Sequence, residues 1–107
     1  MIMNDLSLPH DTMSQNPLLT TVPQEHYFHA ANGTIIRGIL ELDQALEHMS
    51  EETFSYHVNS TKNDFANWIR NIIKDEALAA KIGNTDNKQA MQIIVLRRVI
   101  EIFQQSS

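Results

Sequence analysis

The chain contains no cysteine, which excludes disulfide bonds, thiolate metal ligands and a cysteine nucleophile. It has only three glycines, and they do not form a phosphate-binding loop. No stretch approaches the ~18 consecutive apolar residues of a membrane-spanning helix. The N-terminus also lacks the basic segment and apolar core of a secretory signal. We therefore expect a protein of the reducing cytoplasm without a membrane span.

Proline is confined to the first quarter of the chain, where Pro9, Pro17 and Pro23 lie among Ser, Thr, Asn and Gln residues. This composition predicts a flexible polar tail over residues 1–24. The rest of the chain has room for one domain with a modest core. We expect a single small helical domain over residues 25–105.

Charge is distributed unevenly along the chain, which carries a formal net charge of -5. Residues 1–56 hold eight acidic side chains and one arginine, whereas residues 57–107 hold seven basic and five acidic side chains. The basic residues are scattered and mixed with acids, so the clearly basic face of a nucleic-acid-binding domain is missing. Nucleic acid is therefore an unlikely partner.

Two short strands are expected at residues 26–30 and 34–36, because Asn32-Gly33 between them is a strong hairpin signal. A two-stranded ribbon is barely stable alone, so it must lie against helices. Apolar residues then recur at three- and four-residue spacing over residues 38–49, which predicts an amphipathic helix.

Three further helices are expected before the last one. Ser50, followed by two glutamates, predicts the cap of a helix that ends near Val58. Thr61, with an acid three positions later, has the form of a capping box and opens the next helix. A short helix beginning at Lys74 or Asp75 should end with Gly83 at its C′ position. The predicted fold class is mostly α (α+β), a bundle of four to five helices with a short N-terminal β-hairpin.

The last helix, predicted over about residues 86–104 with Asn84 or Thr85 as its cap, carries two apolar stripes. We assign the first stripe to the core: Ile93, Leu96, Ile100 and Phe103. We assign the second to an interface: Val95, Val99 and Ile102. Because so small a domain has limited interior, this interface would bind an unknown protein partner or a second copy of the chain.

Hydrogen-bonding side chains are unusually dense around the only tryptophan. The candidate binding residues are His57, Asn59, Asn63, Asp64, Asn67 and Trp68. In one interpretation they form a structural lock that pairs backbone groups at two helix ends. In the other they form a site in which Asp64 orients the His57 imidazole for acid–base work.

No catalytic residue, metal ligand or cofactor is predicted. His26 and His29 have the HxxH spacing, but positions three apart on a strand face opposite sides of the sheet. No serine or threonine lies in a recognisable nucleophile elbow.

Two sequence blocks, Tyr56-His57-Val58-Asn59 and Lys62-Asn63-Asp64-Phe65-Ala66-Asn67-Trp68-Ile69, occur together at a fixed gap. With these blocks, residues 26–103 resemble a prokaryotic domain family of unknown function. The resemblance implies a small module that also occurs attached to other domains, and it supplies no reaction, ligand or catalytic residue.

The sequence therefore favours a non-catalytic protein-interaction or accessory module. The alternative is an enzyme or small-ligand binder that uses a groove around His57, Asp64 and Trp68. An interaction module should present a wide apolar face on the last helix, whereas an enzyme should expose the His57 imidazole in a concave pocket.

Overall fold

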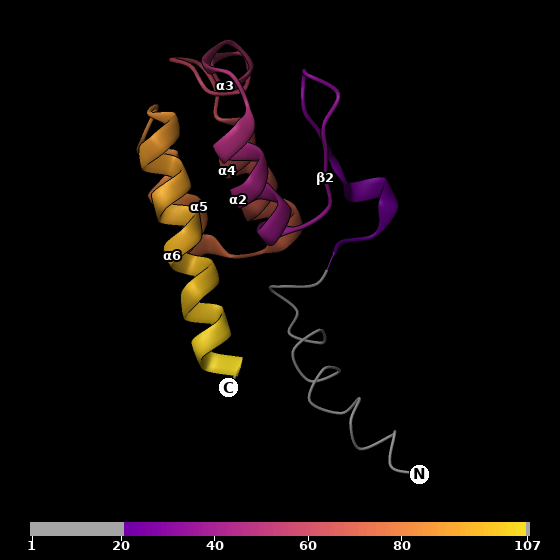
Figure 1. The fold of residues 1–107 in the computed structure, drawn as a ribbon, viewed down its shortest axis with the longest axis vertical. Helices are drawn as coiled ribbons and strands as arrows, with labels where there is room; N and C mark the ends of the chain where they lie inside the picture. The colour runs from indigo at the N-terminus through magenta and orange to yellow at the C-terminus, as the bar shows by residue number, and fades with distance from the viewer. Residues whose placement is uncertain (1–20, 107) are drawn as a thin grey trace.

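The computed structural model describes residues 21–106, and within them it contains five α-helices and a two-stranded antiparallel hairpin (Figure 1). This confirms the predicted fold class. The elements in chain order are the 3-10 turn η1 (Gln24–His26), β1 (Phe28–His29), β2 (Ile35–Ile36), α2 (Ile39–His48), α3 (Glu51–His57), α4 (Asp64–Trp68), the π-helical turn η2 (Ile69–Ile73), α5 (Glu76–Gly83) and α6 (Lys88–Ser106).

The hairpin forms where the Asn-Gly signal predicts it. Phe28 pairs with Ile36 across the two strands. Gly33 turns the chain with a φ of 91°, in the left-handed region that glycine adopts at little cost. Asn32 stabilises the turn because its side-chain oxygen accepts a hydrogen bond from the Thr34 N–H at 3.0 Å. The strands are shorter than expected, since His26 belongs to η1.

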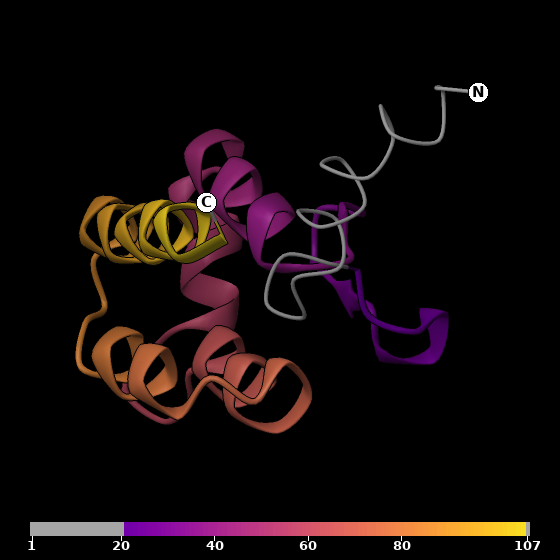
Figure 2. The ribbon, with the colours of Figure 1, turned by 90° about the horizontal axis from the view of Figure 1, so that it is seen from below.

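The helices are arranged in two layers (Figure 2). Helices α2 and α6 lie side by side in one layer, and α4, η2 and α5 lie in the other. The hairpin covers the side of α2 that faces away from α6. The core between the layers is built from wholly buried apolar side chains, among them Leu42, Leu46, Phe65, Leu78, Met91 and Val95.

The two apolar stripes of α6 are the reverse of the prediction. Val95, Val99 and Ile102 are buried, with exposed fractions of 0%, 5% and 0%, so their assignment to an exposed interface is wrong. Ile93, Leu96, Ile100 and Phe103 are instead 52%, 41%, 47% and 38% exposed. Both stripes repeat at helical spacing, and only the packing of α6 against α2 and α5 decides which one faces the core.

Helix starts were predicted with mixed success. Ser50 caps α3, accepting a hydrogen bond from the Thr53 N–H, as expected. Asp75 caps α5 in the same way through the Leu78 N–H. Thr61, however, does not open α4. The next capping residue is Asn63, whose side chain accepts from the Ala66 N–H.

The last two helix boundaries also differ from the prediction. Gly83 is the final residue of α5 rather than a residue beyond its end. Helix α6 starts at Lys88, because the Asn87 side chain accepts a hydrogen bond from the Ala90 N–H. Thr85 stands just before this cap and accepts from the Asn87 N–H.

Contacts with the domain begin before Glu25. The Val22 N–H donates to the Arg37 carbonyl at 2.8 Å, and the Val22 side chain packs against the core. Val22 therefore contacts the domain, although it lies within the predicted tail over residues 1–24; the part of that prediction on residues 1–20 lies outside the described residues. Within residues 21–106, none of the helices has the length and hydrophobicity that a membrane span requires.

Candidate functional site

His57 is the centre of the polar cluster and is only 4% exposed. It ends α3, and both nitrogens of its ring are hydrogen-bonded. The Ala31 N–H donates to Nε2 at 2.9 Å, and Nδ1 lies 3.0 Å from Oδ2 of Asp64. Because a backbone N–H can only donate, Nε2 carries no proton, and the ring donates to Asp64 through Nδ1. The imidazole thus joins the hairpin turn to the first residue of α4.

Asp64 accepts a second hydrogen bond, from Nζ of Lys62 at 3.0 Å. Partial burial raises the pKa of the Asp64 carboxyl, but the hydrogen bonds from His57 and Lys62 and the charge of Lys62 outweigh it, and the pKa lies below its usual range. Asp64 is therefore ionised in the folded protein at neutral pH and orients the His57 ring.

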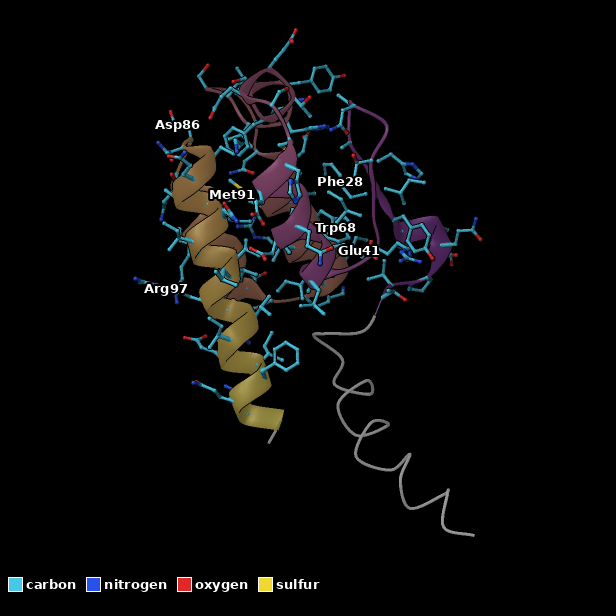
Figure 3. All side chains as sticks on the ribbon, in the orientation of Figure 1. Phe28, Glu41, Trp68, Asp86, Met91 and Arg97 are labelled. Atoms are coloured by element: carbon cyan, nitrogen blue, oxygen red, sulfur yellow. The ribbon has the colours of Figure 1, made fainter. Side chains whose placement is uncertain are left out.

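Aromatic packing completes the junction between hairpin and helices. The Phe28 ring on β1 stacks on Phe65 with centroids 4.8 Å apart, and it meets the edges of His57 and Trp68 at 5.1 and 5.8 Å. Phe28 and Trp68 lie beside each other between the hairpin and α4 (Figure 3). The Trp68 indole donates to the His26 carbonyl at 2.8 Å, which fixes η1 on the same helix.

The three candidate asparagines lie in different surroundings. Asn59 closes the loop after α3: its side-chain oxygen accepts from Thr61, and its amide donates to the Ser55 carbonyl. Asn63 caps α4 and also donates to the Ile82 carbonyl at 2.9 Å, so it ties α4 to the end of α5. Asn67 is exposed, and within residues 21–106 its side chain has no hydrogen-bond partner.

His57 and Trp68 of the predicted groove are buried among their hydrogen-bonded and aromatic partners, and Asp64 is half-buried. The nearby concavity is an open hollow of about 580 Å³, lined by residues 58–63 and 83–86. Asn59 and Asn63 reach this hollow, whereas His57, Asp64 and Trp68 do not line it. Within residues 21–106, no three histidine, aspartate or glutamate side chains come together as metal ligands.

Sequence reasoning missed the partners that the N-terminal segment supplies to this cluster. The Ala31 N–H bonds a residue 26 positions later in the chain, and the His26 carbonyl bonds one 42 positions later. The third partner is the Phe28 ring, which packs beside His57, Phe65 and Trp68. Backbone donors and acceptors leave no trace in side-chain patterns, so only the placement of Phe28 on a strand could have indicated this docking.

Residues 25–107 match the sequence profile of a family of unknown function (DUF5752), and the chain belongs to that family. No curated protein and no solved structure matches the chain. The family assignment agrees with the resemblance to a domain of unknown function and assigns no role to any residue.

The structure predicts different effects for two neighbouring asparagines. Asn63→Ala removes the cap of α4 and leaves the Ile82 carbonyl without its donor, so it should lower the free energy of unfolding by about 1–3 kcal/mol. Asn67→Ala, on the exposed face of the same helix, should change it by less than about 0.5 kcal/mol. Urea denaturation measures both, and equal effects would contradict the assigned cap.

The lowered pKa of Asp64 predicts a pH dependence of stability. Its contribution is complete above the pKa of an unfolded aspartate, about 3.9, and is lost as pH falls through the lower folded value. The difference in unfolding free energy between wild type and Asp64→Asn should therefore be constant above about pH 5 and shrink toward pH 2. Asparagine can still accept the His57 hydrogen bond, so the variant isolates the charge. A difference that grows as pH falls would contradict this prediction.

Proposed function

We propose that the domain is a non-catalytic protein-interaction module whose binding surface is the outward face of α6. The observation that carries the proposal is the line of four large apolar side chains on that face, which we call the outer stripe. Its members are Ile93, Leu96, Ile100 and Phe103.

The outer stripe is unusual because it is continuous. Its residues follow one another at spacings of three, four and three, so they form one row along three turns of a helix. Single exposed apolar residues are normal on a protein surface, but a contiguous row is typical of a surface that another chain covers. In addition, α6 extends beyond the other helices at its C-terminal end (Figure 1).

The His57 cluster supports a structural interpretation over a catalytic one. A general base needs an unprotonated nitrogen that can reach a substrate, and the unprotonated Nε2 of His57 is already bonded to the Ala31 N–H. The Trp68 indole is likewise committed to the His26 carbonyl. A small-ligand site would have to use the hollow beside Asn59 and Asn63 instead. A cytoplasmic location is part of the proposal, on the absence of cysteine.

The proposal is tested by placing two lysines in the outer stripe. Ile93→Lys/Ile100→Lys should abolish association of the full chain with any second chain, because two charges would have to be buried in the interface. Both sites are half exposed, so the unfolding free energy should fall by less than about 1 kcal/mol. Native mass spectrometry of the mildly purified protein measures the associated chains, whether second copies or other proteins.

A control for added charge is Asn71→Lys/Ala80→Lys, which places two lysines on exposed positions of η2 and α5. The control and the wild type should carry the same associated chains. If the stripe variant also carries them, or if none of the three proteins carries any, the outer stripe is not a binding surface.

A further inference from the structure

We infer that the chain covering the outer stripe is a second copy of this protein, docked with its α6 parallel to the first about a two-fold axis. Arg97 of each copy then lies against Asp43 of the other. The inference rests on the proposed function and deepens it by naming the partner and its geometry.

The spacing of the outer stripe is that of a coiled-coil seam. Ile93, Leu96, Ile100 and Phe103 occupy positions a, d, a and d of two heptads. Isoleucine at a with leucine at d is the combination that favours two parallel strands. A seam of two heptads is short, so further contacts beside it must contribute.

One flank of the seam is acidic and belongs to α2. Helix α6 and the hairpin lie on opposite sides of α2 (Figure 2). Glu41, paired with Arg37 next to β2, marks the hairpin side. Asp43 follows two residues later and lies about 160° around the helix, on the α6 side. Lys88 donates to the Leu46 carbonyl, which places the Asp43 turn beside the first turns of α6.

Asp43 is half-buried, and it is the one described residue with a buried side-chain oxygen, Oδ1, that lacks a hydrogen-bond partner. A second copy could reach the carboxylate only through the part of it that is exposed. Burial and the neighbouring charge of Glu47 raise the pKa of the Asp43 carboxyl. Within the described chain, this carboxylate therefore lacks the cation that would stabilise it.

The other flank of the seam is basic. Arg98 forms ion pairs with Asp75 at 2.7 Å and with Glu101 at 3.2 Å. The Arg97 side chain, by contrast, has no hydrogen bond or ion pair within residues 21–106. Its side chain extends from α6 on the side away from α2 (Figure 3). The seam thus runs between an unpaired carboxylate and an unpaired guanidinium.

Symmetry decides the direction of the second copy. A two-fold axis along the helices brings the acidic flank of each copy against the basic flank of the other, and so forms the Arg97–Asp43 contact twice. A two-fold axis across the helices makes α6 antiparallel and brings acidic flank against acidic flank, which is repulsive. Side chains on a helix lean toward its N-terminus. The Arg97 side chain therefore points back along α6, toward the height at which Asp43 of the partner copy lies.

The test uses two charge reversals and their mixture. Arg97→Glu and Asp43→Lys should each weaken self-association of the full chain by at least about tenfold, because each homodimer would hold two like-charge contacts. In an equimolar mixture, both contacts of the heterodimer are again of opposite sign, so association should return to near the wild-type level. Sedimentation equilibrium from about 10 µM to about 1 mM measures all four samples, since we expect a dissociation constant on the order of micromolar.

A disulfide tests the direction independently, since the natural chain has no thiol. Ile93→Cys should form a cross-linked dimer on mild oxidation, because parallel a positions face each other. In an antiparallel pair, the two Ile93 positions would be about 15 Å apart along the axis. Asn71→Cys, on η2, should not cross-link. This arm remains informative if Asp43→Lys does not fold.

The outcomes separate the two proposals. A wild-type chain that stays monomeric at the highest concentration overturns the inference, even if another protein binds the outer stripe. A dimer that shows neither the rescue by mixing nor the Ile93→Cys cross-link overturns the parallel arrangement. A dimer that survives Ile93→Lys/Ile100→Lys overturns the proposed function itself.

Discussion

The hydrogen bond from the Ala31 N–H to the His57 ring is the contact on which the arrangement of the domain depends. A two-residue pairing between β1 and β2 cannot hold a hairpin in place by itself. Three contacts hold the hairpin. His57 accepts a hydrogen bond from the Ala31 N–H in the hairpin turn, and the Trp68 indole donates to the His26 carbonyl in η1. The Phe28 ring packs between His57, Phe65 and Trp68. Asp64 fixes the proton of His57 on Nδ1 and so keeps Nε2 available to the Ala31 N–H.

Most polar side chains of the cluster around His57 already have hydrogen-bond partners within the fold. His57, Asn63 and Trp68, which look most like parts of an active site, make their hydrogen bonds inside the fold, whereas Asn67 is exposed. The groups without partners among the described residues are the exposed apolar side chains of the outer stripe, the carboxylate of Asp43 and the guanidinium of Arg97. The outer stripe and Arg97 belong to α6, and Asp43 belongs to the neighbouring α2. Each lacks a partner among the described residues, which is the basis for proposing that a second chain supplies it.

Most of the fold could be predicted from local patterns, because helix periodicity, the Asn-Gly turn and the Ser50 and Asp75 caps are encoded within a few residues. The cap at Asn63 was missed because Thr61 offers an equally good local pattern, and the Asn63–Ile82 contact that favours the observed start is distant in sequence. The two stripes of α6 were interchanged for a similar reason: both have helical spacing, and only the contacts with α2 and α5 distinguish them. For the His57 cluster, the sequence identified the side chains but not the backbone groups of residues 26–31 that complete it.

The most direct test of this account is the protonation of the His57 ring in the folded protein at neutral pH. Long-range proton–nitrogen NMR correlation distinguishes a ring that is protonated on Nδ1 from one protonated on Nε2. The hydrogen-bond geometry at His57 predicts that the ring carries its proton on Nδ1 and not on Nε2, and that solvent exchange of the Ala31 amide is slow and becomes fast in His57→Phe. A ring protonated on Nε2, or an Ala31 amide that exchanges fast in the wild type, would contradict it.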